Sequence, residues 1–239
     1  MVRTIRKEDD SRPVIDAASH PLTTNHLYFG WYYGKFRDLE RAVTLFYSLS
    51  RLPTEYGAQA LPDPASLDEI WPARTRPDWA GLSLNYRLQV GRLARYVPWR
   101  GDRRSFVRES QAYQAQVLKH ATKLFGRRKY RPTGGTFAFM LNDPAPAISW
   151  SVADRGRRPK AAYSVLMPAM NPLLICAEYP RASYVRGRPN LLLAPVRRQR
   201  FFAGSGCGDP GLGTAARGPE RGPGRRRGRG PEGLGGGDR

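Results

Sequence analysis

The strongest constraint on the fold is a strand, helix, strand pattern in residues 26–60. The run "HLYFGWYY" (26–33) is rich in aromatic residues and is followed by Gly34, which is typical of a strand that ends at a turn. Apolar residues then recur at helical spacing, at Phe36, Leu39, Val43, Phe46 and Leu49. Pro53 breaks this helix, and "TEYGAQA" (54–60) predicts the next strand. Short apolar runs that alternate with amphipathic stretches indicate an α/β fold.

The same alternation continues on both sides of this pattern. A strand is predicted before it, from "PVIDAA" (13–18), and a loop rich in Pro, Asp and Trp after it (63–78). Two helices should follow, the first marked by Tyr86, Val90, Leu93 and Val97, the second by Phe106, Tyr113, Val117, Ala121 and Leu124. The last predicted elements are a strand buried on both faces at "TGGTFAFML" (133–141), a short helix at 158–170, and two strands of a following β domain at 172–180 and 190–196.

Residues 197–239 differ sharply in composition from the rest of the chain. They hold 14 of its 25 glycines and almost no aliphatic side chains, so they cannot bury enough apolar surface to offset the entropy of ordering. We expect this tail to be disordered. The whole chain carries a net charge of +20, mostly from arginine. This skew also fits a GC-rich coding sequence. The tail lacks interleaved aromatic residues that would stack on bases, so we expect it to bind nucleic acid only non-specifically, through charge.

The sequence predicts no cofactor, no metal site and no membrane segment. Cys176 and Cys207 make no CxxC pair, so neither a zinc site nor a disulfide framework is implied. Residues 1–14 carry charge where a signal peptide would be apolar, and no apolar run has the length of a membrane span. The default expectation is a cytoplasmic protein, its compartment being otherwise unknown.

One carboxylate, Glu55, lies where the second strand meets its exit loop. In a (β/α) barrel the catalytic groups lie at the carboxyl ends of the strands, where loops build the site. Glutamate is rarely buried, so an acid in this position is also compatible with a solvated surface residue. Glu55 alone therefore leaves both interpretations open.

Four motifs occur in order along the chain. They are "DDSRP" (9–13), "NHLYFGWYYG" (25–34), "TEYGAQ" (54–59) and "TGGTFAFMLNDPAPAISWSVADRGRRPKAAY" (133–163). Together they resemble glycoside hydrolase family 2, the group that contains β-glucuronidases, β-galactosidases and β-mannosidases. The fourth motif is most similar to the β-mannosidase branch, in which a Gly-led strand ends in Leu-Asn-Asp and is followed by Ser-Trp-Ser and a Lys-containing helix start. The resemblance covers residues 5–196 and implies part of a catalytic (β/α)8 TIM barrel.

The resemblance assigns catalytic roles to two residues. Glu55 matches the family's nucleophile, whose ionised carboxylate forms a covalent glycosyl-enzyme that water later hydrolyses. Tyr28 matches the tyrosine that hydrogen-bonds the nucleophile, and such a bond to the charged form would keep the carboxylate ionised and aimed. From the residues alone, Tyr28 is equally compatible with an ordinary strand aromatic packed in the core.

Five further residues would form the substrate-binding pocket in this resemblance. His26 and Trp31 share the aromatic strand, and Trp31 would offer its apolar face to the sugar ring. Asn142 and Asp143 would reach the same rim from the end of the Gly-led strand, and Phe139 stands where the family usually has a tryptophan beneath the sugar. The residues alone leave simpler interpretations open, namely a buried, hydrogen-bonded histidine and an Asn-Asp turn.

The resemblance also implies that the site is incomplete. A retaining mechanism needs a second carboxylate about 5 Å from the first as general acid and base. In the family it is the Glu of an Asn-Glu pair at the end of barrel strand four, and no Asn-Glu pair occurs in this sequence. The predicted strands would be barrel strands five to eight. The expected domains are then a partial TIM barrel (1–169), the start of a β-sandwich (170–196) and the disordered tail (197–239).

A half barrel has unpaired strand edges and an open core, so the sequence predicts either another chain that completes it or a gene fragment. The abrupt composition of the tail favours a fragment. We expect a β-glycoside as the partner, and little activity from the chain alone, because the general acid is missing. Two other functions stay open at this point. One is nucleic-acid binding through the basic tail, and the other is non-catalytic sugar binding by a remnant of the site.

Overall fold

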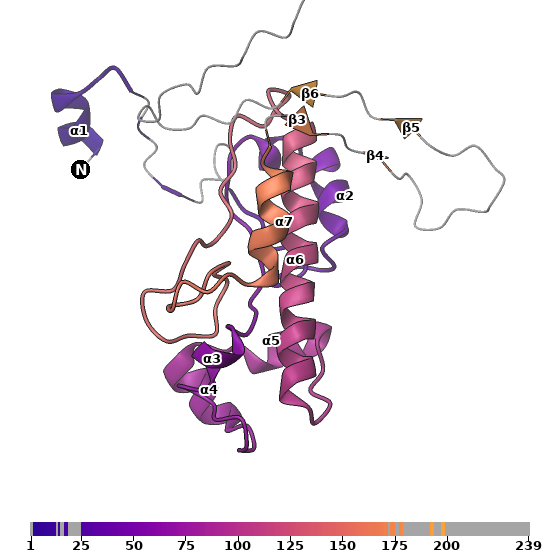
Figure 1. Ribbon diagram of the computed structural model, residues 1–239. Coiled ribbons are helices and arrows are strands. Elements are labelled where there is room, and N and C mark those ends of the chain that lie inside the picture. Colours follow the sequence, from indigo (N-terminus) through magenta and orange to yellow (C-terminus); the bar gives the residue numbers. More distant parts are fainter. Residues whose placement is uncertain are drawn as a thin grey trace, which may run out of the picture. The chain divides into compact units, whose positions relative to one another are not determined.

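The computed structural model describes residues 2–12, 14, 17–18 and 25–171, together with four two-residue strands further along the chain (Figure 1). Its helices are α1 (Val2–Glu8), α2 (Asp38–Leu45), α3 (Pro64–Leu67), α4 (Trp79–Tyr86), α5 (Val90–Tyr96), α6 (Arg103–Arg127) and α7 (Ala161–Ala169), with a 3-10 helix η1 (Tyr47–Ser50) after α2. Its strands are β1 (Asn25–His26), β2 (Pro53–Glu55), β3 (Leu173–Leu174), β4 (Ala177–Glu178), β5 (Leu192–Leu193) and β6 (Arg197–Arg198). The described residues therefore combine helices with short strands.

Strands β1 and β2 pair in parallel, and α2 connects them. The register places His26 opposite Glu55, and the Leu27 amide donates to the Glu55 carbonyl oxygen at 2.7 Å. A parallel pair needs a crossover connection, and the amphipathic helix α2 supplies it by burying Leu39 and Val43. This βαβ unit brings the carboxyl ends of the two strands to the same edge.

The aromatic strand predicted at 26–33 ends earlier than expected. After His26 the chain folds into a tight turn, in which the amides of Trp31 and Tyr32 both donate to the Tyr28 carbonyl oxygen. Gly30 has a φ of +80°, and a Cβ at this position would lie 2.7 Å from the Cβ of Phe36. Only glycine accepts this backbone conformation in so little space. Gly30 therefore permits the tight turn that follows β1.

The "TGGTFAFML" segment, predicted as a strand, is extended and lies beside β2. The Phe137 amide donates to the Pro53 carbonyl oxygen at 2.9 Å, and the Phe139 amide donates to the Tyr56 carbonyl oxygen at 3.0 Å. The segment therefore runs in the same direction as β2. Alternate residues face opposite sides, so Ala138 packs with the fully buried Tyr56, whereas Phe137 is 59% exposed.

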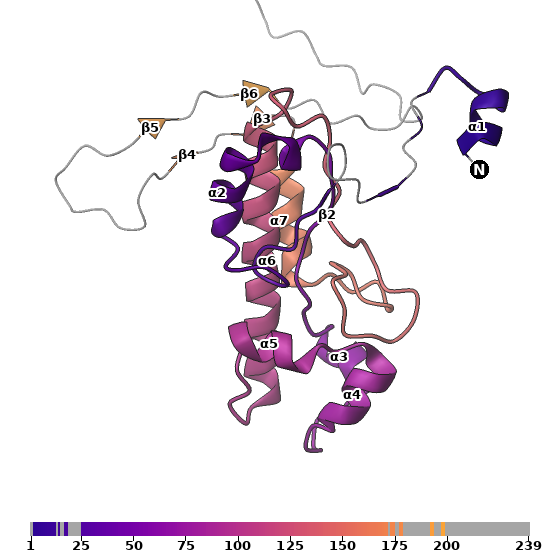
Figure 2. The ribbon, with the colours of Figure 1, turned by 180° about the vertical axis from the view of Figure 1, so that it is seen from behind.

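Helices α6 and α7 lie side by side in both views (Figures 1 and 2). The long helix α6 begins at Asp102, whose carboxylate accepts hydrogen bonds from the amides of Arg104 and Ser105. One buried cluster joins α2, α6 and α7 to the strands, and its members include Leu27, Val43, Tyr56, Leu118, Phe125 and Leu166. A second cluster joins α4, α5 and the first turns of α6, and its members include Trp31, Leu82, Leu93, Phe106 and Ile148.

The segment between β2 and α6 is more helical than the sequence predicts. The loop predicted at 63–78 contains α3, which begins after the N-cap Asp63. Within the helix predicted over 86–97 the structure has the shorter α5, and the preceding helix α4 ends at Tyr86 because Arg87 takes a left-handed φ of 64°. The helix predicted at 158–170 is confirmed as α7.

Two short antiparallel pairs follow α7, β3 with β6 and β4 with β5. Strands β4 and β5 fall inside the segments predicted as strands, 172–180 and 190–196. Strand β6 lies just past residue 196, where the tail is predicted to begin. Three of the six residues of the strand predicted at 13–18, and the tail from residue 199 onward, lie outside the described residues. The domain boundaries stay predictions.

Replacing Gly57 by alanine should destabilise the fold. Gly57 follows β2 with a φ of +155°, and an added Cβ would lie 2.6 Å from the Phe139 carbonyl oxygen. Overpacking of this kind costs about 1–3 kcal/mol, so the urea midpoint of unfolding should fall. Gly91→Ala is the control, because nothing lies within 4 Å of a Cβ added there. It should leave stability unchanged or raise it by up to about 1 kcal/mol. Equal midpoints in the two variants would contradict the packing of Phe139 against the exit of β2.

Candidate active site

The Glu55 carboxylate lies at the end of β2 and is held by Tyr28. The Tyr28 hydroxyl donates to Glu55 Oε2 at 2.7 Å, a distance typical of a strong hydrogen bond to an ionised acceptor. Tyr28 is buried, whereas the Glu55 side chain keeps 28% of its surface exposed. The carboxylate is therefore fixed by a buried donor and still accessible from outside. The structure thus brings together the two residues to which the resemblance assigns catalytic roles.

The Tyr28 hydroxyl keeps its proton at any physiological pH. Burial raises the pKa of Tyr28 well above its usual value, and the hydrogen bond to Glu55 and the charge of that carboxylate raise it further. Because the tyrosine does not ionise, its proton is always available to the carboxylate. On the tyrosine side, the pair therefore has a fixed neutral donor.

His26 approaches the other carboxylate oxygen. Its Nε2 lies 3.5 Å from Glu55 Oε1, across the β1–β2 register. This distance is longer than an ordinary hydrogen bond, and the contact is an ion pair only when the imidazole is protonated. His26 is only partly buried. The two oxygens of Glu55 therefore face different groups, Tyr28 at Oε2 and His26 at Oε1.

Three aromatic rings surround Tyr28. The centroids of Tyr32, Trp150 and Phe139 lie 5.1, 6.3 and 6.4 Å from the Tyr28 centroid, all in edge-to-face geometry. This arrangement is favoured for aromatic pairs and limits the movement of the central ring. Phe139 thus lies next to Tyr28, which holds Glu55. The peptide bond between Phe139 and Met140 is cis.

Trp31 is placed differently from the sequence prediction, in which its ring lines the sugar pocket. Its side chain is buried, with 1% of the residue exposed. The indole N–H donates to Gln89 Oε1 at 2.9 Å, and the ring stacks on Tyr96. The tight turn after β1 directs the ring against α5. Trp31 therefore supports the site from the core and presents no face to a sugar.

Asn142 and Asp143 are predicted at the same rim, but they have different surroundings. Asn142 is exposed. Asp143 is 3% exposed, and its two carboxylate oxygens accept hydrogen bonds from the hydroxyls of Ser149 and Ser151, each at 2.5 Å. This burial corrects the prediction for Asp143, which holds the loop that follows it closed and does not face the rim.

No role for Lys160 is predicted from the sequence, although the residue is fully buried. Its ammonium group donates to the carbonyl oxygens of Ala60 at 3.1 Å and Ser149 at 3.4 Å. It therefore ties the exit of β2 to the loop that Asp143 closes. Burial lowers the pKa of Lys160 to about 8, and the charges of Asp143 and Asp154 offset part of this fall. The sequence feature that could have indicated this role is the lysine at the helix start in the fourth motif.

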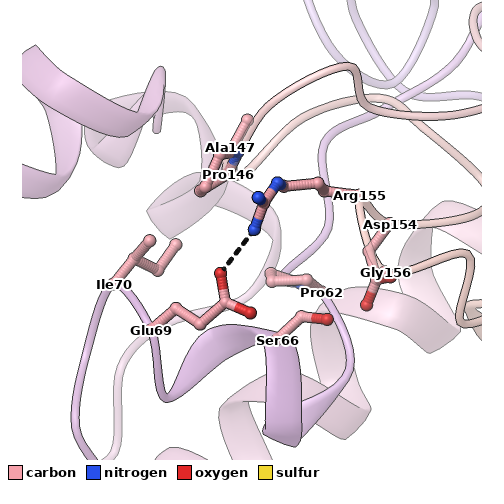
Figure 3. A pocket seen from close by; sticks show the side chains of 9 residues that line it. All are labelled: Pro62, Ser66, Glu69, Ile70, Pro146, Ala147, Asp154, Arg155 and Gly156. Carbon is pink, nitrogen blue, oxygen red and sulfur yellow. Dashed lines mark hydrogen bonds and ion pairs between the residues drawn. The ribbon is translucent and has the colours of Figure 1, made fainter.

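The pocket in Figure 3 is too small for a sugar. It encloses about 10 Å³, which is room for about one water molecule. The ion pair between Glu69 and Arg155, at 3.0 Å, crosses it. The residues that line it do not include Glu55, Tyr28 or any other residue of the predicted site. A larger cavity of about 290 Å³ lies beside α4 and is also lined by other residues.

Two kinds of feature are absent from the part of the chain that the structure describes. There, no group of three or more His, Cys, Asp and Glu side chains could hold a metal ion. No helix there is both long and apolar enough to cross a bilayer.

Comparison with known proteins points to one group of glycosidases. No protein-family model matches the chain. β-Mannosidase B of Aspergillus niger is 35% identical over 74 residues, which are 28% of this chain and 9% of that protein. The Aspergillus clavatus β-mannosidase B is 34% identical over the same length. The crystal structure of the β-D-mannosidase from Dictyoglomus thermophilum superposes with a TM-score of 0.55 and 20% identity, over 66% of this chain and 20% of that one.

A segment of the chain is thus similar to fungal β-mannosidases B, and the fold is similar to that of a bacterial β-D-mannosidase. At 20% identity the likeness to the bacterial structure shows the fold alone, and it agrees with the predicted α/β architecture at that coarse level. The numbering of strands five to eight stays a prediction. The matched segment spans about a tenth of the length of the fungal relatives. A β-mannosidase activity of this chain is therefore a proposal.

Raising the pH from 8 to 10 should stabilise the fold through Lys160. Its pKa is about 8 in the folded chain and 10.5 in a free side chain. Below pH 8 both states are protonated, and the full penalty for burying the charge applies. Between pH 8 and 10 the unfolded state binds more protons, so the free energy of unfolding rises, by at most about 1.4 kcal/mol per pH unit.

Urea unfolding of the wild type and Lys160→Met at pH 8, 9 and 10 measures this slope. The variant should lose the Lys160 contribution and show a lower slope. Lys119→Met, at an exposed position of α6, should keep the wild-type slope. Equal slopes in wild type and Lys160→Met would show that the amine is not buried as described.

Proposed function

We propose that this chain carries the nucleophile side of a retaining, exo-acting β-glycoside hydrolase site, with Glu55 as the nucleophile. The observation that carries the proposal is the 2.7 Å hydrogen bond from buried Tyr28 to the accessible Glu55 carboxylate. A nucleophile of this class must be ionised and aimed, and a fixed neutral donor favours both conditions. The β-mannosidase names of the fungal relatives make a β-mannoside the first substrate to test.

In this proposal Oε1 of Glu55 attacks the anomeric carbon. Tyr28 occupies Oε2, so Oε1 is the oxygen left for the new bond. The C–O bond to Oε1 forms as the bond to the leaving-group oxygen breaks, and that oxygen takes a proton from the general acid. Water then attacks the glycosyl-enzyme, gives up a proton to the same group and frees the carboxylate. His26, 3.5 Å from Oε1, would lie beside the sugar.

Phe139 would form an apolar floor for the sugar, because it packs beside Tyr28 and is partly exposed. Asn142 is exposed and would be available for a hydroxyl of the sugar at the rim. Trp31 and Asp143 are buried, and the proposed pocket leaves both out.

The general acid would come from outside these 239 residues, since they contain no Asn-Glu pair. The exposure of Phe137 indicates that one side of the site is open. It is two residues from Phe139 along an extended segment, so both rings face the same side, and 59% of Phe137 is exposed. Another polypeptide could cover Phe137 and bring a carboxylate to about 5 Å from Glu55. Without it, only leaving groups that need no proton should react.

A 2-fluoro glycoside with a dinitrophenyl leaving group should label Glu55. The leaving group departs without a proton, and the fluorine slows hydrolysis of the adduct. Intact mass spectrometry of the purified chain should show one added glycosyl group, and Glu55→Gln should abolish it. Glu109→Gln, which changes a glutamate on α6, should label like the wild type. An unlabelled wild type, or a labelled Glu55→Gln variant, would contradict the nucleophile assignment.

Tyr28→Phe should slow this labelling about ten- to a hundredfold, because a hydrogen bond to a charged group is worth about 1.5–3 kcal/mol. The variant keeps the ring and removes only the donor to Glu55. Tyr33→Phe is the matched control, since Tyr33 is 51% exposed. The measurement is the rate of adduct formation by mass spectrometry. Equal rates in the two variants would mean that the Tyr28 hydroxyl does not aim the carboxylate.

A further inference from the structure

Gln89 connects the α4–α5 segment to the turn that carries Tyr28. Gln89 is the N-cap of α5, yet its side chain makes no capping bond. Instead Oε1 accepts the indole N–H of Trp31 at 2.9 Å, and Nε2 donates to the Tyr32 hydroxyl at 3.0 Å. N-cap side chains usually satisfy free amides of the first helical turn. The side-chain amide of Gln89 therefore bonds two neighbouring aromatic residues, Trp31 and Tyr32, and does not cap the helix.

Gln59 adds a second connection to the same loop. The backbone N–H of Gln89 donates to Gln59 Oε1 at 2.9 Å, and Gln59 Nε2 donates to the Arg87 carbonyl oxygen at 2.8 Å. Gln59 is fully buried and lies on the segment that leaves β2 just after Glu55. The loop between α4 and α5 is therefore bonded both to the turn after β1 and to the exit of β2.

Tyr32 transmits this support to Tyr28. The two rings meet edge to face, with centroids 5.1 Å apart and planes at 73°. The Arg92 guanidinium, from α5, lies 4.5 Å from the Tyr32 centroid, so the face of this ring is also held. With its hydroxyl and its face both fixed, Tyr32 restricts the positions open to the Tyr28 ring, whose hydroxyl donates to Glu55.

We propose that Gln89 is a positioning residue for the nucleophile. By fixing Trp31 and Tyr32, it keeps the Tyr28 hydroxyl on Glu55 without touching the sugar. This role rests on the proposed function of Glu55, whereas the hydrogen bonds of Gln89 to Trp31 and Tyr32 are independent of it. A misplacement of about 1 Å can slow a reaction about a hundredfold, so losing the two side-chain bonds of Gln89 should slow reaction at Glu55.

Gln89→Met tests this role, because methionine has a similar length and makes neither hydrogen bond. Labelling by the fluorinated dinitrophenyl glycoside is followed in the full chain at several reagent concentrations. The limiting rate should fall about tenfold or more, and the half-saturating concentration should stay the same. Gln116→Met, at an exposed position on α6, should behave as wild type. A merely structural role would lower the fraction of chains that label and leave the rate of the folded fraction unchanged.

Exchange of the Trp31 indole N–H, followed by ¹⁵N NMR, gives a readout that needs no chemistry at Glu55. Trp31→Phe identifies the resonance. The proton should exchange about tenfold faster or more in Gln89→Met than in the wild type or Gln116→Met, because its acceptor is gone. Tyr32→Phe removes only the hydroxyl that accepts from Gln89 and keeps the ring. It should therefore fold and slow labelling less than Gln89→Met does.

Two results would overturn the role of Gln89. They are an unchanged limiting rate in Gln89→Met while the wild type labels, and an unchanged indole exchange in the same variant. A wild type that does not label overturns the proposed function instead. In that case faster indole exchange in Gln89→Met would still support Gln89 as the residue that fixes the turn after β1.

Discussion

The register of the β1–β2 pair is the constraint on which the candidate site depends. His26 lies opposite Glu55, and the Leu27 amide binds the Glu55 carbonyl oxygen, so the next residue, Tyr28, comes within 2.7 Å of the carboxylate. Successive residues of a strand face opposite sides, so a slip by one residue would turn Glu55 towards the helices and Tyr56 towards the open side. The complete burial of Tyr56 against α6 opposes such a slip.

Buried polar side chains then fix the loops around this pair. Lys160 binds two carbonyl oxygens from different loops, and Asp143 binds two serine hydroxyls. Gln59 joins the exit of β2 to the residues before α5, since its side chain accepts from the Gln89 backbone amide and donates to the Arg87 carbonyl oxygen. An unpaired polar group is costly in a buried position, so each of these side chains selects one arrangement of the loops it joins. The carboxylate therefore has little freedom although its own strand is short.

The βαβ unit and the Tyr28–Glu55 pair could be predicted because the helical period, Pro53 and the family motifs all point to the same place. The direction of Trp31 could not, because it depends on Gln89, 58 residues later in the chain. The break between α4 and α5 depends on the backbone conformation of Arg87, which no local pattern marks. Sequence periodicity predicts which residues share an element, whereas such long-range hydrogen bonds decide where individual polar and aromatic side chains point.

The most direct measurement is a double-mutant cycle of Tyr28→Phe and Glu55→Gln in the free energy of unfolding. A hydrogen bond from a neutral donor to a charged acceptor is worth about 1.5–3 kcal/mol, and residues in contact show coupling of that order. If Tyr28 holds the Glu55 carboxylate, the two changes should be non-additive by about 1 kcal/mol or more. Additive effects would show that the hydroxyl and the carboxylate do not interact, and the nucleophile assignment would lose its structural basis.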